Sequence, residues 1–427
     1  MKILIVGSGG REHALLRKLK ESPENPVLFA APGNGGMATD ATCVPIAAND
    51  VEKMVAFAVQ EHMDYVVVAP DDPLVLGMVD ALEKEGIPAF GPNKAAAILE
   101  GSKVFSKNLM KKYKIPTAQY ETFDCVEKAV RFLKVNNTYP IVIKADGLAL
   151  GKGVLICEDE CAALTAVKSI LTDKKFGASG NRIVIEEFLS GPEVSVLSFT
   201  DGKTVVPMVS SMDHKRAEDG DNGLNTGGMG TIAPNPYYTQ DIAAVCMETI
   251  FKPTVAAMNA EHRSFKGCLY FGLILTQQGP KVIEYNCRFG DPETQVVLPL
   301  LESDLLTIMR ATTNGTLQAD MVRFSSQSAA CVVLASGGYP QNYETGKPIT
   351  GLTDGQLTGS NAIVYHAGTK LAGDLLVTSG GRVLGVTAVE DNLISAIKAA
   401  YAAAENIAFA GAHRRTDIGQ KALQAKV

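Results

Sequence analysis

A short stretch of the chain, KVIEYNCRFGDPE at residues 281–293, combines residue types that could carry out phosphate chemistry. It begins with β-forming residues, which predicts a strand. Glu284 and Asn286 are two positions apart, so they project from the same face of that strand. A carboxylate and an amide oxygen suit Mg²⁺, which also binds substrate phosphates. Arg288 could stabilise negative charge on a phosphoryl group. The alternative interpretation is a strand end with a solvated ion pair.

A second set of candidate residues surrounds a glycine-rich loop. Ile141–Ala145 is typical of a buried strand that carries Lys144, and the loop DGLALGKG follows at residues 146–153. The N–H groups of this loop, together with Lys152, could cover the phosphates of a nucleoside triphosphate while Lys144 approaches them from the strand. The loop is not a Walker A sequence. The alternative is a β-hairpin whose flexible loop requires glycine.

Carboxylates close a later predicted strand. The apolar stretch IVIEEF at residues 183–188 ends in two glutamates, and Glu193 follows. Adenine could form hydrogen bonds with main-chain groups of this segment, and Glu193 could accept hydrogen bonds from ribose hydroxyls. Taken alone, the segment would favour the alternative, in which charged residues simply close a strand.

Two further segments could bind anions. The turn GSGGREH at residues 7–13 follows an apolar strand, and its glycines, helix N-terminus and Arg11 indicate a phosphate site. It lacks the G-x-G-x-x-G pattern of a dinucleotide site, and the alternative is a tight turn that needs glycine. Further on, DHKR at 213–216 precedes NTGGMG at 225–230, and a cationic cluster beside a backbone nest indicates an anion or zwitterion site. A lone histidine such as His214 is more often structural.

The elements that must position these residues suggest three domains. Strands and helices alternate over residues 1–102, which predicts a doubly wound parallel sheet whose ligands bind beyond the carboxyl ends of its strands. Residues 103–324 hold most of the candidate side chains, and we expect 269–276 and 281–287 to form a hairpin there. Short strands linked by glycine-rich turns predict a small α+β domain at 325–427.

Composition limits the class of protein. A chain of 427 residues is too long for one core, and 46% hydrophobic with 20% charged residues is ordinary for a soluble protein. A net charge of −6 argues against a nucleic-acid groove. No signal peptide or membrane-length apolar run is present, so we expect a cytoplasmic protein that binds no membrane. The eight cysteines include no C-x-x-C pair and are expected to be reduced thiols.

Taken together, these motifs resemble one enzyme family over nearly the whole chain. The set GSGGREHA, LEGSK, VIKADGLA-GKGV, IEEFL, DHKR, NTGGMG, EYNCRFGDPETQ and RRTDIG is similar to that of the glycinamide ribonucleotide synthetases, or phosphoribosylamine–glycine ligases, of the ATP-grasp superfamily. The resemblance implies a central ATP-grasp fold over 103–324 with a mobile lid subdomain at about 120–190. It also implies ATP-dependent ligation of glycine to 5-phosphoribosylamine through a glycyl phosphate, an early step of purine synthesis that releases ADP and phosphate.

The resemblance also assigns roles to particular residues. The loop 147–153 would close over ATP, and ATP-binding residues would be Lys103, Lys144, Gly151, Lys152, Gly153, Glu186, Glu187, Leu189 and Glu193. Substrate-binding residues would be Gly9, Gly10, Arg11, Pro70, Asp71, Asp213, His214, Lys215, Asn225, Thr226, Gly227, Gly228 and Met229. Glu284 and Asn286 would bind Mg²⁺ or Mn²⁺, and Arg288, Lys144 and Asp291 would act in catalysis. A monomer is expected.

Two positions depart from the family pattern, and two rival functions are considered. Asp71 stands where the family has glutamate, and Leu224 where proline is expected before NTGGMG. One rival is an ATP-grasp enzyme that activates bicarbonate or formate, against which DHKR, NTGGMG and the C-terminal domain argue. The other is a non-catalytic dinucleotide-binding protein, which would leave Glu284, Asn286 and Arg288 without a role.

Overall fold

The first part of the chain forms a parallel sheet covered on both faces, as predicted. The computed structural model describes residues 1–149 and 153–425. The strand order is β3-β2-β1-β4-β5, and all pairs are parallel. Ile3 and Ile5 of the central strand belong to one apolar cluster and Leu4 and Val6 to another, so both faces are buried. The elements are β1 (Lys2–Gly7), α1 (Gly10–Lys20), β2 (Val27–Pro32), η1 (Met37–Thr39), β3 (Thr42–Cys43), α2 (Val51–Gln60), β4 (Tyr65–Val68), α3 (Asp71–Leu76), α4 (Met78–Lys84), β5 (Ala89–Phe90) and α5 (Lys94–Gly101).

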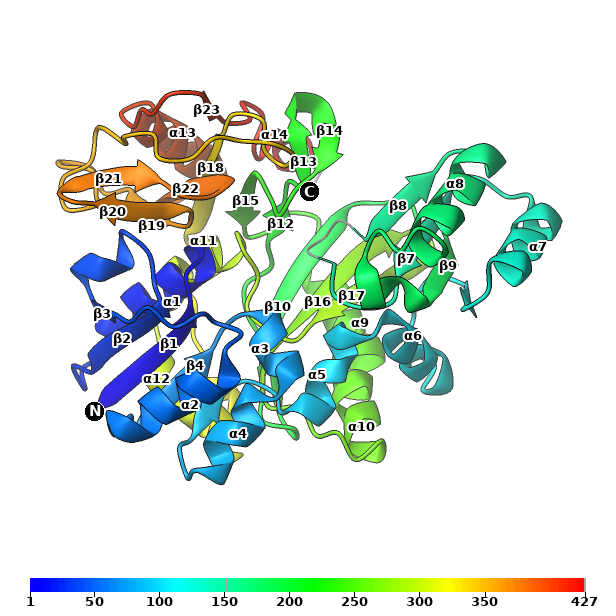
Figure 1. Cartoon of the computed structure of the whole chain (residues 1–427), viewed down its shortest axis with the longest axis horizontal. Coiled ribbons are helices and arrows are strands. Elements are labelled where there is room, and N and C mark those ends of the chain that lie inside the picture. Colours follow the sequence, from blue (N-terminus) through cyan, green and yellow to red (C-terminus); the bar gives the residue numbers. More distant parts are fainter. Residues whose placement is uncertain (150–152, 426–427) are drawn as a thin grey trace.

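The central part of the chain contains two antiparallel sheets. One, in the order β6-β9-β7-β8, extends away from the rest of the molecule with α7 and α8 (Figure 1). The other has the order β11-β10-β16-β17, and its β16–β17 pair confirms the predicted hairpin. The elements are α6 (Lys103–Lys112), β6 (Tyr120–Phe123), α7 (Val126–Asn136), β7 (Ile141–Ala145), β8 (Val154–Cys157), α8 (Glu160–Leu171), η2 (Gly177–Asn181), β9 (Ile183–Glu187), β10 (Glu193–Thr200), β11 (Val205–Pro207), α9 (Gln240–Cys246), the π-helical η4 (Met247–Phe251), α10 (Lys252–Ala260), β16 (Gly267–Thr276) and β17 (Gly279–Asn286).

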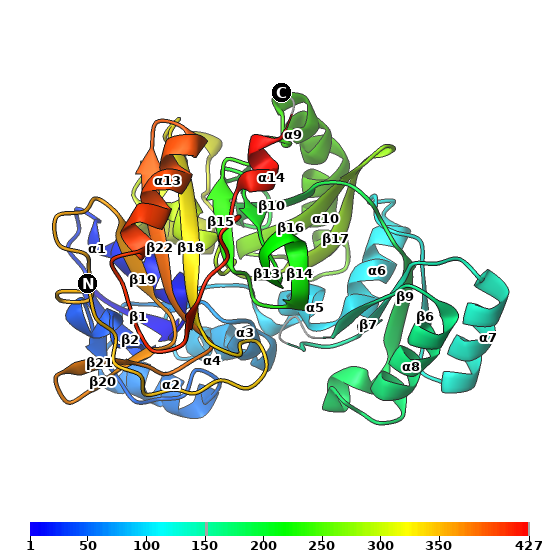
Figure 2. The ribbon, with the colours of Figure 1, turned by 90° about the horizontal axis from the view of Figure 1, so that it is seen from above.

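A fourth sheet joins the middle of the chain to its C-terminal part (Figure 2). Its order is β12-β15-β18-β22-β19, with β23 also on β18, and α13 packs against it. Because β12 and β15 come from residues 212–233, this sheet draws on both sides of the predicted boundary at 324/325, which stays a prediction. The elements are β12 (Met212–Asp213), β13 (Arg216–Glu218), η3 (Asp219–Asp221), β14 (Asn222–Asn225), β15 (Gly230–Ala233), β18 (Ser328–Ser336), β19 (Ile363–His366), β20 (Thr369–Ala372), β21 (Leu375–Thr378), β22 (Arg382–Glu390), α13 (Leu393–Ala404), β23 (Ala412–His413) and α14 (Gln420–Leu423).

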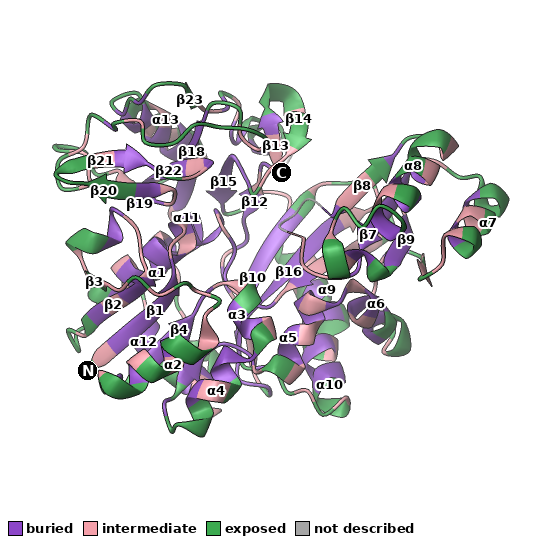
Figure 3. Ribbon diagram, viewed as in Figure 1, coloured by how far each residue is buried: buried purple, intermediate pink, exposed green. Residues whose placement is uncertain are grey.

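The segment between the central and C-terminal sheets packs back on the first sheet. It comprises α11 (Thr294–Val297), η5 (Leu298–Leu300), α12 (Leu305–Asn314) and η6 (Ala319–Met321). The Tyr65 hydroxyl of β4 donates to the Met309 carbonyl of α12 at 2.9 Å. Burial follows the sheets and the helix faces turned toward them (Figure 3). In the part of the chain that the structure describes, no helix has the length and apolar character needed to cross a membrane.

Candidate active site

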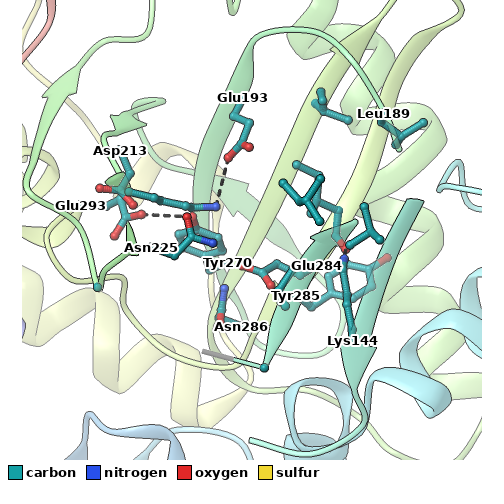
Figure 4. Close-up of a pocket in the computed structure, with 18 of the residues that line it drawn as sticks. Lys144, Leu189, Glu193, Asp213, Asn225, Tyr270, Glu284, Tyr285, Asn286 and Glu293 are labelled. Carbon is teal, nitrogen blue, oxygen red and sulfur yellow. Dashed lines mark hydrogen bonds and ion pairs between the residues drawn. The ribbon is translucent and has the colours of Figure 1, made fainter. Parts of the chain in front are cut away.

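One large cavity of about 1140 Å³ lies where the three parts of the molecule meet. Side chains from the two central sheets and from the sheet that contains β12 and β22 line it, together with residues from helices of the N-terminal part, and most of the predicted site residues are among them. In Figure 4, Lys144 and Leu189 lie at one end, Asp213, Asn225 and Glu293 at the other, and Glu284 with Asn286 between them. We call the first the lysine end (Lys103, Lys107, Lys144 and Glu186) and the second the carboxylate end (Asp213, Lys215, Asp291, Glu293 and Arg382).

The lysine end is built around a buried glutamate. Val142 of β7 pairs with Glu186 of β9, so Lys144, two residues further on, projects from the same face. Lys144 and Lys107, the latter from α6, both form ion pairs with Glu186, and all three side chains are buried. Burial alone would raise the pKa of Glu186, but the two lysines outweigh it and lower that pKa. This arrangement places a net positive charge in the cavity wall.

Lys107 was missed by sequence reasoning. It lies four residues after Lys103, so the two lysines share a face of α6, and this spacing was the available signal. Lys103 Nζ donates to the Gly147 carbonyl at 3.2 Å, next to the glycine-rich loop. Burial lowers the pKa of Lys103. The predicted ATP ligands Gly151 and Lys152 lie outside the described residues, whereas Gly153 lines the cavity.

The middle of the cavity holds the three residues from which the functional prediction started. On β17, Tyr285 points into the core, so Glu284 and Asn286 face the cavity together, as predicted. Burial would raise the pKa of Glu284, but four neighbouring cations, led by Lys215 and Lys144, lower it. The carboxylate therefore stays ionised and suits a hard cation.

Arg288 is held beside this pair. Its Nη2 lies 3.1 Å from Glu100 Oε1 and donates to Asn286 Oδ1 at 3.2 Å. The other Glu100 oxygen accepts from the Cys287 N–H at 2.6 Å, so one buried carboxylate fixes both the main chain and the guanidinium. Sequence reasoning quoted Glu100 within LEGSK but assigned it no role.

The carboxylate end combines acids with cations from distant segments. Lys215 Nζ pairs with Glu193 at 3.0 Å, so the predicted ribose ligand makes an ion pair in this structure. The Tyr270 hydroxyl donates to Glu293 Oε1 at 3.1 Å. Asp213 Oδ1 is buried without a hydrogen-bond partner among the described residues. Burial, reinforced by the Glu293 charge, raises the pKa of Asp213 well above its usual range.

Arg382 closes this end from the C-terminal sheet. Its Nη1 donates to the carbonyls of Gly227 and Asp291, both at 2.7 Å, and lies 3.3 Å from Asp291 Oδ1. Burial would raise the pKa of Asp291, but Arg382 and Arg11 lower it. The guanidinium therefore fixes the NTGGMG segment to the predicted catalytic aspartate.

The N-terminal turn is arranged differently from the prediction. Arg11 and Asp71 line the cavity, and burial would raise the pKa of Asp71 but the Arg288 and Arg11 charges lower it. The Gly9 N–H, however, donates to Glu12 Oε2 at 2.6 Å. Glu12 thus occupies the amide that was expected to face an anion. Five predicted substrate ligands are absent from the described cavity lining: Gly9, Gly10, Pro70, Gly228 and Met229.

The fold and the cavity define a class of protein, and comparison with known families defines it further. The family model described as the phosphoribosylglycinamide synthetase ATP-grasp (A) domain matches residues 101–294, so this is an ATP-grasp enzyme. The N and C domains of the same family match residues 1–100 and 329–421. The chain belongs to the phosphoribosylglycinamide synthetase family.

Similar proteins share the full length of the chain. Phosphoribosylamine–glycine ligase of Rhodopirellula baltica is 48% identical over 427 residues, covering 99% of this chain and 98% of that protein. The ligase of Caldanaerobacter subterraneus is 46% identical over 418 residues, covering 98% and 99%. The crystal structure of the Thermotoga maritima ligase has a TM-score of 0.86 at 33% identity, covering 98% of this chain and all of that one. A Campylobacter jejuni biotin carboxylase, with a TM-score of 0.77 at 15% identity, shares the fold alone.

Proposed function

We propose that this chain ligates glycine to 5-phosphoribosylamine at the expense of ATP, through a glycyl phosphate. The products are glycinamide ribonucleotide, ADP and phosphate, in purine biosynthesis. The observation that carries the proposal is the position of Glu284, Asn286 and Arg288 between the lysine end and the carboxylate end of one cavity. A nucleotide and an amino acid could therefore meet at this point, in a chain whose full-length relatives are named phosphoribosylamine–glycine ligases.

The reaction requires activation rather than a protein nucleophile. A carboxylate does not react with an amine at neutral pH, because oxide is a poor leaving group. In the first step a glycine carboxylate oxygen attacks the γ-phosphorus of ATP, the bond to the β-phosphate oxygen breaks, and ADP leaves. In the second step the amine of phosphoribosylamine attacks the glycyl carbon, phosphate leaves, and the amine loses a proton. Positioning and charge neutralisation carry such a phosphoryl transfer.

The residues along the cavity divide this work. Lys103 and Lys144 would neutralise ATP phosphates at the lysine end, and Arg288 would stabilise the transferring phosphoryl group. At the carboxylate end, Lys215 could pair with the carboxylate of glycine, and Asp213 Oδ1, buried without a described partner, could accept a hydrogen bond from its ammonium group. Arg11, which also lines the cavity, would bind the phosphate of phosphoribosylamine.

A metal ion fits the middle of the cavity. Glu284 supplies an ionised carboxylate and Asn286 an amide oxygen, which are hard ligands for Mg²⁺ or Mn²⁺. Among the described residues no group of three or more His, Cys, Asp or Glu side chains could hold a metal by itself. An ion that takes its other ligands from phosphates and water agrees with this donor set. When bound, it would neutralise charge on the ATP phosphates.

Isotope transfer tests the proposal directly. Glycine labelled with ¹⁸O in its carboxylate is supplied with ATP and phosphoribosylamine, and the released phosphate is analysed by mass spectrometry. We expect one labelled oxygen in phosphate per amide formed. A bicarbonate-activating enzyme would take no label from glycine, and omission of phosphoribosylamine serves as the control for uncoupled ATP hydrolysis. Unlabelled phosphate formed together with the amide would rule out the glycyl phosphate. Cytoplasmic location and a monomeric state stay predictions.

A further inference from the structure

A small exposed hairpin forms part of the cavity wall. The hairpin consists of β13 and β14 (residues 216–225), which pair only with each other. Its two ends continue into Asp213–Lys215 and into Thr226–Gly227, and both of these segments line the carboxylate end. Within the hairpin only Ala217 is buried. A two-stranded hairpin with so little apolar burial is marginally stable by itself, so other contacts must fix its position.

Those contacts come from the C-terminal tail, which we define as residues 413–421. Arg415 is its centre, with a side chain only 1% exposed. Its Nε and Nη2 donate to the two Asp417 carboxylate oxygens at 2.7 and 2.8 Å. Its Nη1 donates to Asp221 Oδ1 at 2.8 Å and to the Arg216 carbonyl at 3.1 Å, both of which belong to the hairpin. One guanidinium therefore makes four hydrogen bonds, two within the tail and two to the hairpin.

Further bonds follow the same seam. The Thr416 N–H donates to Asp219 Oδ1 at 2.7 Å, and the Gly220 N–H donates to Asp417 Oδ2 at 2.8 Å. His413 Nε2 lies 2.7 Å from the Ala217 carbonyl oxygen. The tail also reaches the base of the hairpin, where the Gly419 N–H donates to His214 Nε2 at 3.0 Å. Residues 216–221 of the hairpin are thus attached to the tail by hydrogen bonds.

The neighbouring arginine shows that this is particular to Arg415. Arg414 approaches Glu405 only to 3.8 Å, and its side chain is 31% exposed. A buried arginine must have its charge paired and its donors satisfied, whereas a partly exposed pair contributes little. The planar fork of arginine meets Asp417 with two parallel bonds, a geometry that lysine cannot reproduce.

We propose that Arg415 is a positioning residue for the reaction. It holds the hairpin against the tail, and thereby fixes Asp213–Lys215 and Thr226–Gly227 where they form the carboxylate end. Arg415 itself is not among the described residues that line the cavity. The proposal rests on the proposed function only in assigning that end to glycine and phosphoribosylamine.

Hydrogen exchange and steady-state kinetics of the full chain test this together. In Arg415→Ala, hairpin amides should exchange roughly 10- to 100-fold faster, because several hydrogen bonds to charged groups are lost. The KM for glycine or phosphoribosylamine should rise about tenfold while the KM for ATP stays within about twofold. Arg415→Lys should recover part of both effects, and Arg414→Ala, the matched control, should behave as wild type.

Two results would overturn the proposal. One is unchanged hairpin exchange in Arg415→Ala, and the other is an equal rise in all three KM values, which indicates a merely structural role. If Arg415→Ala does not fold, Asp221→Ala removes the hairpin carboxylate that accepts from Arg415 Nη1, and wild-type exchange and kinetics in that variant would equally contradict the positioning role. If the wild-type protein makes no amide, the proposed function fails, while the exchange comparison still tests the attachment of the hairpin.

Discussion

The two ends of the cavity are constructed in different ways. At the lysine end, Lys107 and Lys144 both pair with Glu186 inside the protein, which satisfies the carboxylate and leaves a net positive charge. At the carboxylate end, Arg382 reaches Asp291 across 91 residues of sequence, and Asp213 keeps a buried oxygen without a described partner. The buried carboxylate of the first end is thus paired within the protein, whereas the second end is completed by contacts between distant segments and, on our proposal, by substrate.

This difference suggests a division between a general and a specific half. Paired lysines beside a glycine-rich loop suit any nucleoside triphosphate. On our proposal, specificity for the acid and the amine comes from the carboxylate end. Variants in the middle of the cavity should lower or abolish turnover. Variants at either end should show whether that end contributes mainly to the stability of the protein or to substrate binding.

The largest expected effect concerns the middle, where the two ends meet. Glu284→Ala removes the one carboxylate of the proposed metal pair, so turnover at ordinary Mg²⁺ concentrations should be abolished. Because Glu284 lies among cations, its loss should also lower the stability of the substrate-free protein. Release of ADP across a Mg²⁺ titration measures the first effect. Near-normal turnover would show that Glu284 is not a ligand, and Glu302→Ala, at an exposed position, is the control.

A smaller loss is expected for Arg288→Ala. Removing one preorganised charge partner of a transition state costs about 3–4 kcal/mol, or about 10²–10³-fold in rate. ATP binding should change much less, because Arg288 lies beyond the lysine end. Turnover and the Kd for ATP should be measured on the same preparation. Comparable losses in both would place Arg288 in nucleotide binding, and the surface Arg310→Ala should alter neither.

The different construction of the two ends also determines how much of each could be predicted from the sequence. The strands that carry Lys144 and Glu284 were predictable because β-forming residues flank both side chains in the sequence. Lys107 could have been found from its helical spacing to Lys103. Glu12 follows Gly9 at the spacing of a capping box, which would have warned that the Gly9 amide is already bonded. No local pattern links Arg382 to Asp291. Arg382 begins β22 and Asp291 follows β17, so only the tertiary fold brings them together.

The lysine end can be tested through stability. Lys107→Met leaves Glu186 with Lys144 as its remaining ion-pair partner at a buried site. Removing one member of a buried ion pair costs about 3–5 kcal/mol, and we expect about 3 because Lys144 remains. Hydrogen exchange on β7 and β9 across a urea titration would localise the loss. Lys112→Met removes a lysine of the same helix that pairs with Glu261 at the surface, and it should change stability much less. Equal losses would mean that Glu186 is not a buried ion-pair centre.

The smallest expected effect is a pH dependence of stability that differs between the two ends of the cavity. Burial, followed by the Arg415 charge, lowers the pKa of His214 to about 4, from an ordinary value of 6.5. The pKa of His214 is lower in the folded protein than in the unfolded one. The contribution of neutral His214 to the stability of the fold is therefore fully present above pH 6.5, and it is lost as the pH falls toward 4. Between pH 7 and 5.5 the loss should be about 1 kcal/mol. Protonation would also place a charge where Nε2 accepts from the Gly419 N–H, so the hairpin side of the cavity should loosen first.

Amide hydrogen exchange in residues 213–229 should therefore become faster relative to exchange in β7 and β9 between pH 7 and 5.5, once the intrinsic effect of pH on exchange is subtracted. His214→Asn should remove the pH-dependent part of that difference, and Asp213, which remains in both proteins, cancels from the comparison. His262→Asn, at an exposed position, should leave the difference intact. If wild type and His214→Asn lose stability equally between pH 7 and 5.5, His214 is not the acid-sensitive group. The carboxylate end would then be no more dependent on its distant contacts than the lysine end is on its buried ion pairs.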